Sequence, residues 1–254
     1  MLFSLVTSGL IITIANFFGK EIAGVVSSLI FVPWTGALVV LSIILVIRGG
    51  VIGSHGKAWV FFAIFAAFWF IATQVWTVYA VVYHAKPFPS GADFFYLAGY
   101  PPHFLFLLFY LQPFKKVISK KMITLGSLIA VTVLIPNFYM TLDTNAGEDE
   151  LATILGTTYP VADAIMLVPA IIGVVLFFRG EVNFLWSLLL FGILIQVAAD
   201  TAFQYFSLDN SYYNGHPIDI LYLWPYILFS FGIYDHIKIY KNKKNSYQNK
   251  ENLR

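Results

Sequence analysis

Long stretches without charged residues alternate with short polar segments along most of the chain. Crossing the hydrocarbon core of a bilayer takes about 20 apolar residues in a helix, which pairs its own backbone polar groups. The eight stretches are Leu2–Phe18, Ala23–Ile47, Ala58–Tyr83, Phe94–Phe114, Met122–Leu142, Leu151–Phe178, Val182–Leu208 and His216–Ile237. The pattern predicts an all-α, polytopic transmembrane bundle over residues 1–237, followed by a basic tail, 238–254.

The first stretch is the shortest and has two interpretations. It is either a true helix or a signal peptide, although no Lys or Arg precedes it and no small-x-small cleavage site is clear after it. The bundle therefore has eight helices, or seven if this stretch is not a span.

Composition supports a membrane class and excludes several others. Hydrophobic residues make up 59% of the chain and charged residues only 11%, far from the balance of a soluble domain. The absence of cysteine excludes disulfides, thiolate catalysis and cysteine-based metal centres. The small basic excess lies in a few loops and the tail, so we expect the lipid bilayer as a partner and no nucleic acid.

The cations predict the orientation, because cytoplasmic loops are enriched in Lys and Arg. On one side of an eight-span bundle fall Arg48, Lys57, Lys115, Lys116, Lys120, Lys121, Arg179, Lys238, Lys241, Lys243, Lys244, Lys250 and Arg254. Only Lys20 and Lys86 fall on the other side, together with the acidic segment from Asp143 to Glu150. We therefore expect a protein of the cell membrane with both termini in the cytoplasm.

One sequence motif occurs twice in the chain. Asp93-Phe-Phe-Tyr96-Leu97-Ala-Gly-Tyr100 matches Asp219-Ile-Leu-Tyr222-Leu223-Trp-Pro-Tyr226 at an offset of 126 residues, which also pairs Tyr79 with Tyr205 and Gln74 with Asp200. This offset covers four helices, an even number, so the two copies run in the same direction across the membrane. It predicts a parallel four-helix repeat, with halves of about 1–115 and 116–237.

The acidic residues are the first candidates for a site. Asp93 and Asp219 begin helices after turns containing Pro and Gly, so they are either helix caps or ligand contacts. Asp163 and Asp200 lie inside apolar helices, where a lone carboxylate is costly. For these two, structural pairing with Tyr or Gln and ligand binding are equally compatible with the sequence. We expect both to face the bundle interior near Gln74, Tyr79 or Tyr205.

Aromatic residues occur at the same predicted depth, near the outer surface. Single rings of this kind usually belong to the interfacial belt, but their coincidence with four Asp favours a pocket for an organic or cationic ligand. The predicted ligand-binding residues are Gln74, Trp76, Tyr79, Asp93, Tyr96, Tyr159, Asp163, Asp200, Tyr205, Asp219 and Tyr222.

Other chemistries find little support in the sequence. His84 and His216 lie in outer loops beside Asp93 and Asp219, with His103 deeper in the bundle, and are the candidates for a metal site. They lack the close spacing of metal ligands, so no metal or other cofactor is assigned. There is no P-loop, dinucleotide glycine fingerprint, Gly-x-Ser-x-Gly elbow or His-Glu-x-x-His motif. An intramembrane hydrolase stays open, but no residue is assigned as its nucleophile, and we do not favour an enzyme.

Several segments of the chain resemble those of a known family. They are Lys57-Ala-Trp59, the turn Pro89-Ser90-Gly91-Ala92-Asp93 continuing to Tyr96-Leu97, Tyr159-Pro160-Val-Ala-Asp163, Ala199-Asp200 and Asp219-Ile-Leu-Tyr222-Leu223. They resemble the multi-helix membrane sensor region of bacterial diguanylate cyclase and phosphodiesterase (GGDEF/EAL) proteins and of some histidine kinases, over residues 57–237. The resemblance implies a membrane-embedded input domain. The chain departs from this family at Gln74, where an acid is frequent, and no output domain follows Tyr240.

Two functions follow as expectations. The first is a sensor or binding module that recognises a small organic or lipidic ligand in its outer half and signals to a cytoplasmic partner. The second is a proton-coupled transporter or lipid-handling membrane protein, because a duplicated bundle with carboxylates in the membrane can support alternating access.

Overall fold

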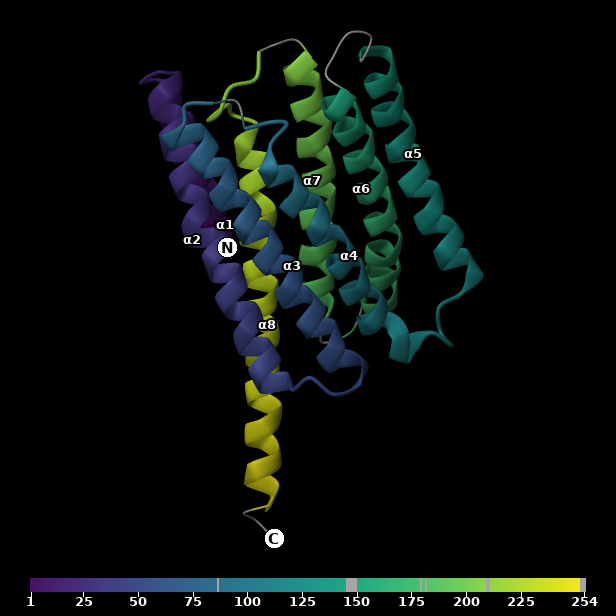
Figure 1. The fold of residues 1–254 in the computed structure, drawn as a ribbon. Coiled ribbons are helices and arrows are strands. Elements are labelled where there is room, and N and C mark those ends of the chain that lie inside the picture. The colour runs from purple at the N-terminus through teal and green to yellow at the C-terminus, as the bar shows by residue number, and fades with distance from the viewer. Residues whose placement is uncertain (86, 145–149, 179, 181, 209–210, 252–254) are drawn as a thin grey trace.

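Eight α-helices form the part of the chain that the computed structural model describes, residues 1–85, 87–144, 150–178, 180, 182–208 and 211–251 (Figure 1). They are α1 (Leu2–Asn16), α2 (Lys20–Gly49), α3 (Gly53–Thr77), α4 (Gly91–Leu111), α5 (Lys120–Thr144), α6 (Glu150–Phe177), α7 (Asn183–Leu208) and α8 (Asp219–Glu251). A π-helical turn, Val78–Val82, extends α3, and a 3₁₀ turn, Gln112–Phe114, extends α4. The all-α prediction is confirmed.

Five of these helices are long and apolar enough to cross a membrane: α2, α3 with its π-helical turn, α4 with its 3₁₀ turn, α6 and α7. Side chains such as Leu29, Val131 and Phe191 are about half exposed on the outside of the bundle, as expected for surfaces that contact lipid. The chain is therefore a multi-pass membrane protein. The predicted spans at α5 and α8 are helical but fall outside this set in the described residues.

The first predicted span is a helix, but a short one. With 15 residues, α1 reaches only about 22 Å at 1.5 Å per residue, less than the hydrocarbon thickness. Its N-terminus lies near mid-height of the bundle, and the helix lies against α2 and α8 (Figure 1). It covers only the upper part of these helices.

The helices run alternately up and down, so their connections lie at two ends of the bundle (Figure 1). The α1–α2, α3–α4 and α7–α8 connections lie at the upper end, whereas α2–α3, α4–α5 and α6–α7 turn at the lower end, below which the tail of α8 extends. Arg48, Lys57, Lys115 and Lys120 lie at the lower end, and Lys20 at the upper end. Lys86, Arg179 and the acidic residues Glu148 and Asp149 lie outside the described residues.

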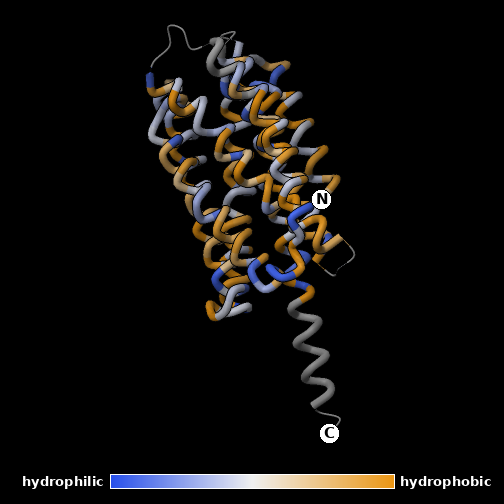
Figure 2. The backbone as a smooth tube through the Cα atoms, turned by 90° about the vertical axis from the view of Figure 1, so that its right-hand side faces the viewer, coloured by the Kyte–Doolittle hydropathy of each residue, from blue (hydrophilic) through white to orange (hydrophobic). Residues whose placement is uncertain are grey.

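An aromatic core fills the lower half. Trp59, Phe62 and Phe106 are fully buried among α3 and α4, and Trp186 of α7 packs so closely on α6 that a side chain at Gly173 would overlap its ring. The backbone in Figure 2 is predominantly apolar along the helices. Packed rings thus fill the interior among the described residues of the lower half.

Helix neighbours follow a regular order. In the first half α1 packs on α2, α2 on α3 and α3 on α4, and in the second half α5 packs on α6, α6 on α7 and α7 on α8. The halves are joined by α2 against α8, by α6 against α4 and by α1 against α8. If helices α1–α4 are exchanged in order with α5–α8, each of these contacts becomes another of them, except the contact of α1 with α8.

Candidate functional site

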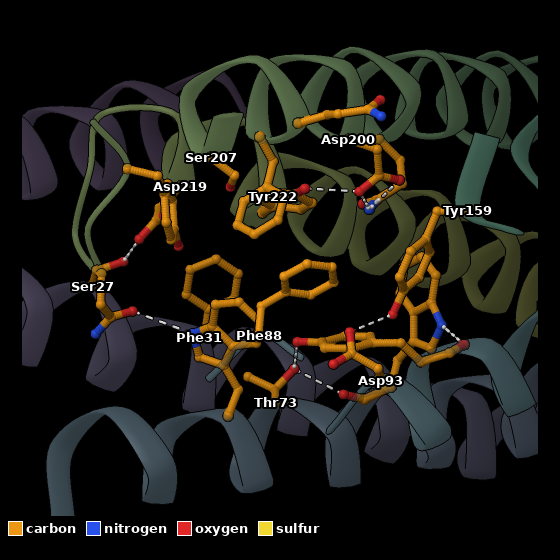
Figure 3. A pocket seen from close by; sticks show the side chains of 18 of the residues that line it. Ser27, Phe31, Thr73, Phe88, Asp93, Tyr159, Asp200, Ser207, Asp219 and Tyr222 are labelled. Carbon is orange, nitrogen blue, oxygen red and sulfur yellow. Dashed lines mark hydrogen bonds between the residues drawn. The ribbon is translucent and has the colours of Figure 1, made fainter. Parts of the chain in front are cut away.

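A cavity of about 140 Å³ occupies the upper half of the bundle, with walls from α2, α3, α4, α6, α7, α8 and the connection before α8 (Figure 3). Seven of the eleven predicted ligand-binding residues line it: Trp76, Asp93, Tyr96, Tyr159, Asp200, Asp219 and Tyr222. They come from α3, α4, α6, α7 and α8. Residues that lie more than 100 positions apart in the sequence thus meet around one space.

Asp219 joins the last helix to α2 and to the preceding connection. Its Oδ2 accepts hydrogen bonds from the Ser27 hydroxyl at 2.9 Å and from the Gly215 N–H at 2.8 Å, and its Oδ1 accepts one from the Tyr212 hydroxyl at 3.2 Å. Asp219 as a whole is only 5% exposed. Asp219 therefore holds the connection against α2, in addition to beginning its own helix.

Asp93 has the capping role expected for it. Ser90 and Asp93 form a capping box at the start of α4, in which the Ser90 N–H donates to Asp93 Oδ2 at 2.7 Å. The other oxygen accepts a hydrogen bond from the Tyr159 hydroxyl of α6 at 2.8 Å. One carboxylate thus caps α4 and also connects it to the opposite half of the bundle (Figure 3).

Asp163 and Asp200 form a pair of carboxyl groups at the α6–α7 contact. Their side chains are close enough to interact electrostatically, and Asp163 Oδ2 is buried without a hydrogen-bond partner among the described residues. Tyr100 donates to Asp163 at 2.7 Å and Tyr222 donates to Asp200 at 2.8 Å. Two carboxylates this close repel each other strongly when both are ionised, so the arrangement favours a proton shared between them.

The prediction that Asp163 and Asp200 face the interior is confirmed: Asp163 is 2% exposed and Asp200 lines the cavity. The predicted partners are wrong. Asp200 accepts hydrogen bonds from Tyr222 and Gln196, and Asp163 from Tyr100, so phenols from α4 and α8 take the place of Gln74, Tyr79 and Tyr205.

Gln74, Tyr79 and Tyr205 do not line the cavity. Gln74 donates to the backbone of its own helix at Phe70, Tyr79 packs edge-on against Tyr83, and Tyr205 is 58% exposed. Tyr205 follows Asp200 by five residues, about 140° around a helix at 100° per residue, so it points away from that face. Asp163 does not line the cavity either, but it accepts a hydrogen bond from Tyr100, which does.

The structure adds lining residues that the sequence prediction omitted. Trp69, Thr73, Trp76 and Thr77 follow one face of α3. Their spacing of three or four residues places them on one helix face, so Trp69, Thr73 and Thr77 could have been predicted from Trp76. Tyr100 and Tyr226 could have been predicted in the same way, because each lies four residues after a predicted site residue, Tyr96 or Tyr222. The other additions include Ser27, Ser28, Phe31, Phe88, Tyr100, Gln196, Phe203, Tyr212, Asn214 and Tyr226.

Asn214 shows why some of these could not be found from the sequence. It lies in the connection before α8, where its amide donates to the Gly24 carbonyl at 2.9 Å and to the Ser28 hydroxyl at 3.0 Å, and its oxygen accepts from the Trp76 indole at 3.2 Å. Its partners on α2 and α3 lie far away in the chain. Only the tertiary structure reveals such contacts.

The two histidines considered for a metal lie apart from the cavity lining. His84 is exposed, and the Nδ1 of His216 accepts the Ile218 N–H at 3.3 Å. Burial, with a smaller effect from nearby Lys20, lowers the pKa of His216, which leaves its ring neutral at neutral pH. Among the described residues, no group of three or more His, Asp and Glu is arranged to hold a metal ion.

Comparison with known proteins gives no relative: no protein-family model, curated protein or solved structure matches the chain.

Proposed function

We propose that the chain is a membrane-embedded binding module that takes a small ligand into its upper cavity and signals occupancy to a cytoplasmic partner. The observation that carries this proposal is the cavity itself. Six helices contribute to its walls, and carboxyl and hydroxyl groups are placed among aromatic rings. A concave site that is mostly apolar with a few oriented polar groups is typical of small-molecule binding.

Occupancy of the cavity would reach the lower end through α8. Tyr222 and Tyr226 of this helix line the cavity, and the same helix continues to Glu251, beyond the lower end of the bundle (Figure 1). Asp219 ties its upper end to Ser27 of α2. A ligand that changes the spacing of α2, α7 and α8 would therefore move the tail helix, where a partner could respond.

The experiment is native mass spectrometry of the protein released from the membrane that produced it. We expect a bound molecule of low mass, lost when Thr77, which lines the cavity, is replaced by Trp. Thr132→Trp is the matched control, because Thr132 is exposed on α5. Equal retention by both variants would contradict the assignment of the cavity as the binding site.

The orientation belongs to the same proposal: the lower end, with the tail of α8, is cytoplasmic. The predicted cytoplasmic N-terminus does not fit this arrangement, because α1 is short and the N-terminus lies near mid-height of the bundle (Figure 1). The cluster of cations at the lower end supports it. In this cysteine-free chain, single cysteines at exposed His84 and exposed Lys116 should react with a membrane-impermeant thiol reagent from opposite sides of sealed vesicles. Modification of both from one side would exclude this topology.

A parallel four-helix repeat is also part of the proposal. The exchange of helix pairs between the halves supports it. Two of the hydrogen bonds between the halves join corresponding pairs of helices: Asp219 of α8 to Ser27 of α2, and Asp93 of α4 to Tyr159 of α6. The two acids match at the offset of 126 residues, whereas Ser27 and Tyr159 do not. The cavity then lies between two similar halves that carry different polar residues, Gln74 and Asp200.

A second candidate function is proton-coupled transport, favoured by the Asp163–Asp200 pair. Two carboxyl groups inside a membrane bundle that can share a proton are suited to exchanging it for a substrate. A cavity of about 140 Å³ favours a small substrate over a whole lipid at this site, so we propose transport ahead of lipid handling. Accumulation of the copurified molecule in vesicles under an imposed pH gradient would favour transport over sensing.

A further inference from the structure

We infer that the cavity takes a small organic ammonium ion, a quaternary or methylated amine about the size of choline. This inference rests on the proposed function and specifies its ligand class.

Charge favours a cation. Asp93, Asp200 and Asp219 line the cavity, and no Lys or Arg is among the described lining residues. Among the described residues, the hydrogen bonds to these three carboxyl groups come from neutral groups: tyrosine and serine hydroxyls, backbone N–H groups and the Gln196 amide. Neutral donors stabilise a carboxylate without cancelling its charge. A monovalent cation would supply the missing positive charge.

Carboxyl groups lie on different sides of the space, separated by aromatic rings (Figure 3). Among these rings, Tyr226 is 5.7 Å from Trp69 and 6.0 Å from Phe31 between ring centroids, and Phe203 is 5.2 Å from Phe88. Rings that surround a cation attract it through their faces and contact its methyl groups, whereas a bare metal ion needs several oxygens at one point. The arrangement suits an alkylated ammonium.

Volume limits the size of the ion. A buried apolar cavity of about 150 Å³ is filled by a molecule as small as benzene. The space here is about 140 Å³, so it fits a trimethylammonium group with a short substituent and excludes a phospholipid or a sterol.

A wider space at the upper end gives a route to the cavity. It has a volume of about 650 Å³ and is lined by Lys20, Glu21 and His84 among others. Phe88, Phe203 and Tyr212 line both spaces, and Phe203 and Tyr212 pack with ring centroids 4.6 Å apart. These three rings separate the cavity from the upper surface, so a ligand would pass between them.

The test compares choline with 3,3-dimethyl-1-butanol, which has the same shape with carbon in place of the charged nitrogen. Binding to the full chain in lipid nanodiscs is measured by calorimetry. We expect choline to bind at least about tenfold more tightly than the alcohol, the effect of roughly 1.4 kcal/mol of charge-dependent attraction. Asp200→Asn should weaken choline binding by a similar factor and leave the alcohol unchanged. Asp235→Asn, in the lower half of α8, should change neither.

Equal affinity for the two probes, or tighter binding of the alcohol, would overturn the inference while leaving a binding cavity in place. Binding of neither probe would overturn it too, and the proposed function would then be decided separately by the copurified molecule and its loss in Thr77→Trp. If Asp200→Asn unfolds, the comparison of the two probes on the parent protein still decides the role of charge.

Discussion

Replacing Gly215 with alanine is expected to destabilise the protein severely and to disrupt the cavity. Gly215 has φ +89°, a conformation that costs a residue with a side chain about 1–2 kcal/mol. An added Cβ would also lie 2.3 Å from the Ala23 carbonyl carbon and 2.4 Å from the Gly24 nitrogen. These are backbone atoms of α2, which cannot turn aside, so we expect a total loss of about 3 kcal/mol or more.

Thermal unfolding in detergent measures this effect, and Gly53→Ala is its control. Gly53 has a similar φ of +76°, but no atom lies within 4 Å of the position its Cβ would take. That variant has the conformational cost alone. Equal loss of stability in the two variants would show that the close approach of the 211–218 connection to α2 is wrong.

Replacing Asp219 with alanine is expected to have the second large effect. It would leave the Ser27 hydroxyl and the Gly215 N–H, both buried, without their acceptor, together with the Tyr212 hydroxyl. A buried donor without a partner costs about 1–3 kcal/mol, so a loss of about 3–5 kcal/mol in the free energy of unfolding is expected. The measurement is unfolding in mixed detergent micelles.

Two further variants test whether the loss of stability comes from these hydrogen bonds. Asp219→Asn keeps one acceptor oxygen and the shape of the side chain, and should recover at least half of the loss. Asp235→Ala lies sixteen residues further along α8, about 24 Å down the helix, and should change stability little. If Asp219→Ala were as stable as Asp235→Ala, Asp219 would not hold α8 against α2.

The helices and their apolar character could be predicted well from the sequence, because long uncharged stretches are sufficient to identify them. The number of helices that cross the membrane was harder to predict. The structure has the first stretch as a helix of 15 residues, and α8 combines an apolar core with Asp219, Pro225 and Asp235. A residue pattern records hydrophobicity, but the depth that each helix reaches depends on its neighbours.

Site residues were predicted best where polar chemistry recurs in the repeat. Asp93 and Asp219, with Tyr96 and Tyr222, lie around the cavity, whereas Tyr79 and Tyr205, matched by the same offset, do not line it. The offset preserves position along a helix and says nothing about the direction of a side chain. Asn214 could not be predicted at all, since its role depends on contacts between segments far apart in the chain.

The central claim, a ligand cavity reached from water inside a membrane bundle, is tested most directly by thiol modification. The chain has no cysteine, so single replacements report one position each. Ser207 lines both the cavity and the wider space above it, whereas Ser230 is 4% exposed and lies outside the cavity lining. We predict that Ser207→Cys reacts with a small, water-soluble, cationic methanethiosulfonate in sealed vesicles while Ser230→Cys does not. An unreactive Ser207→Cys in the folded protein would contradict the account.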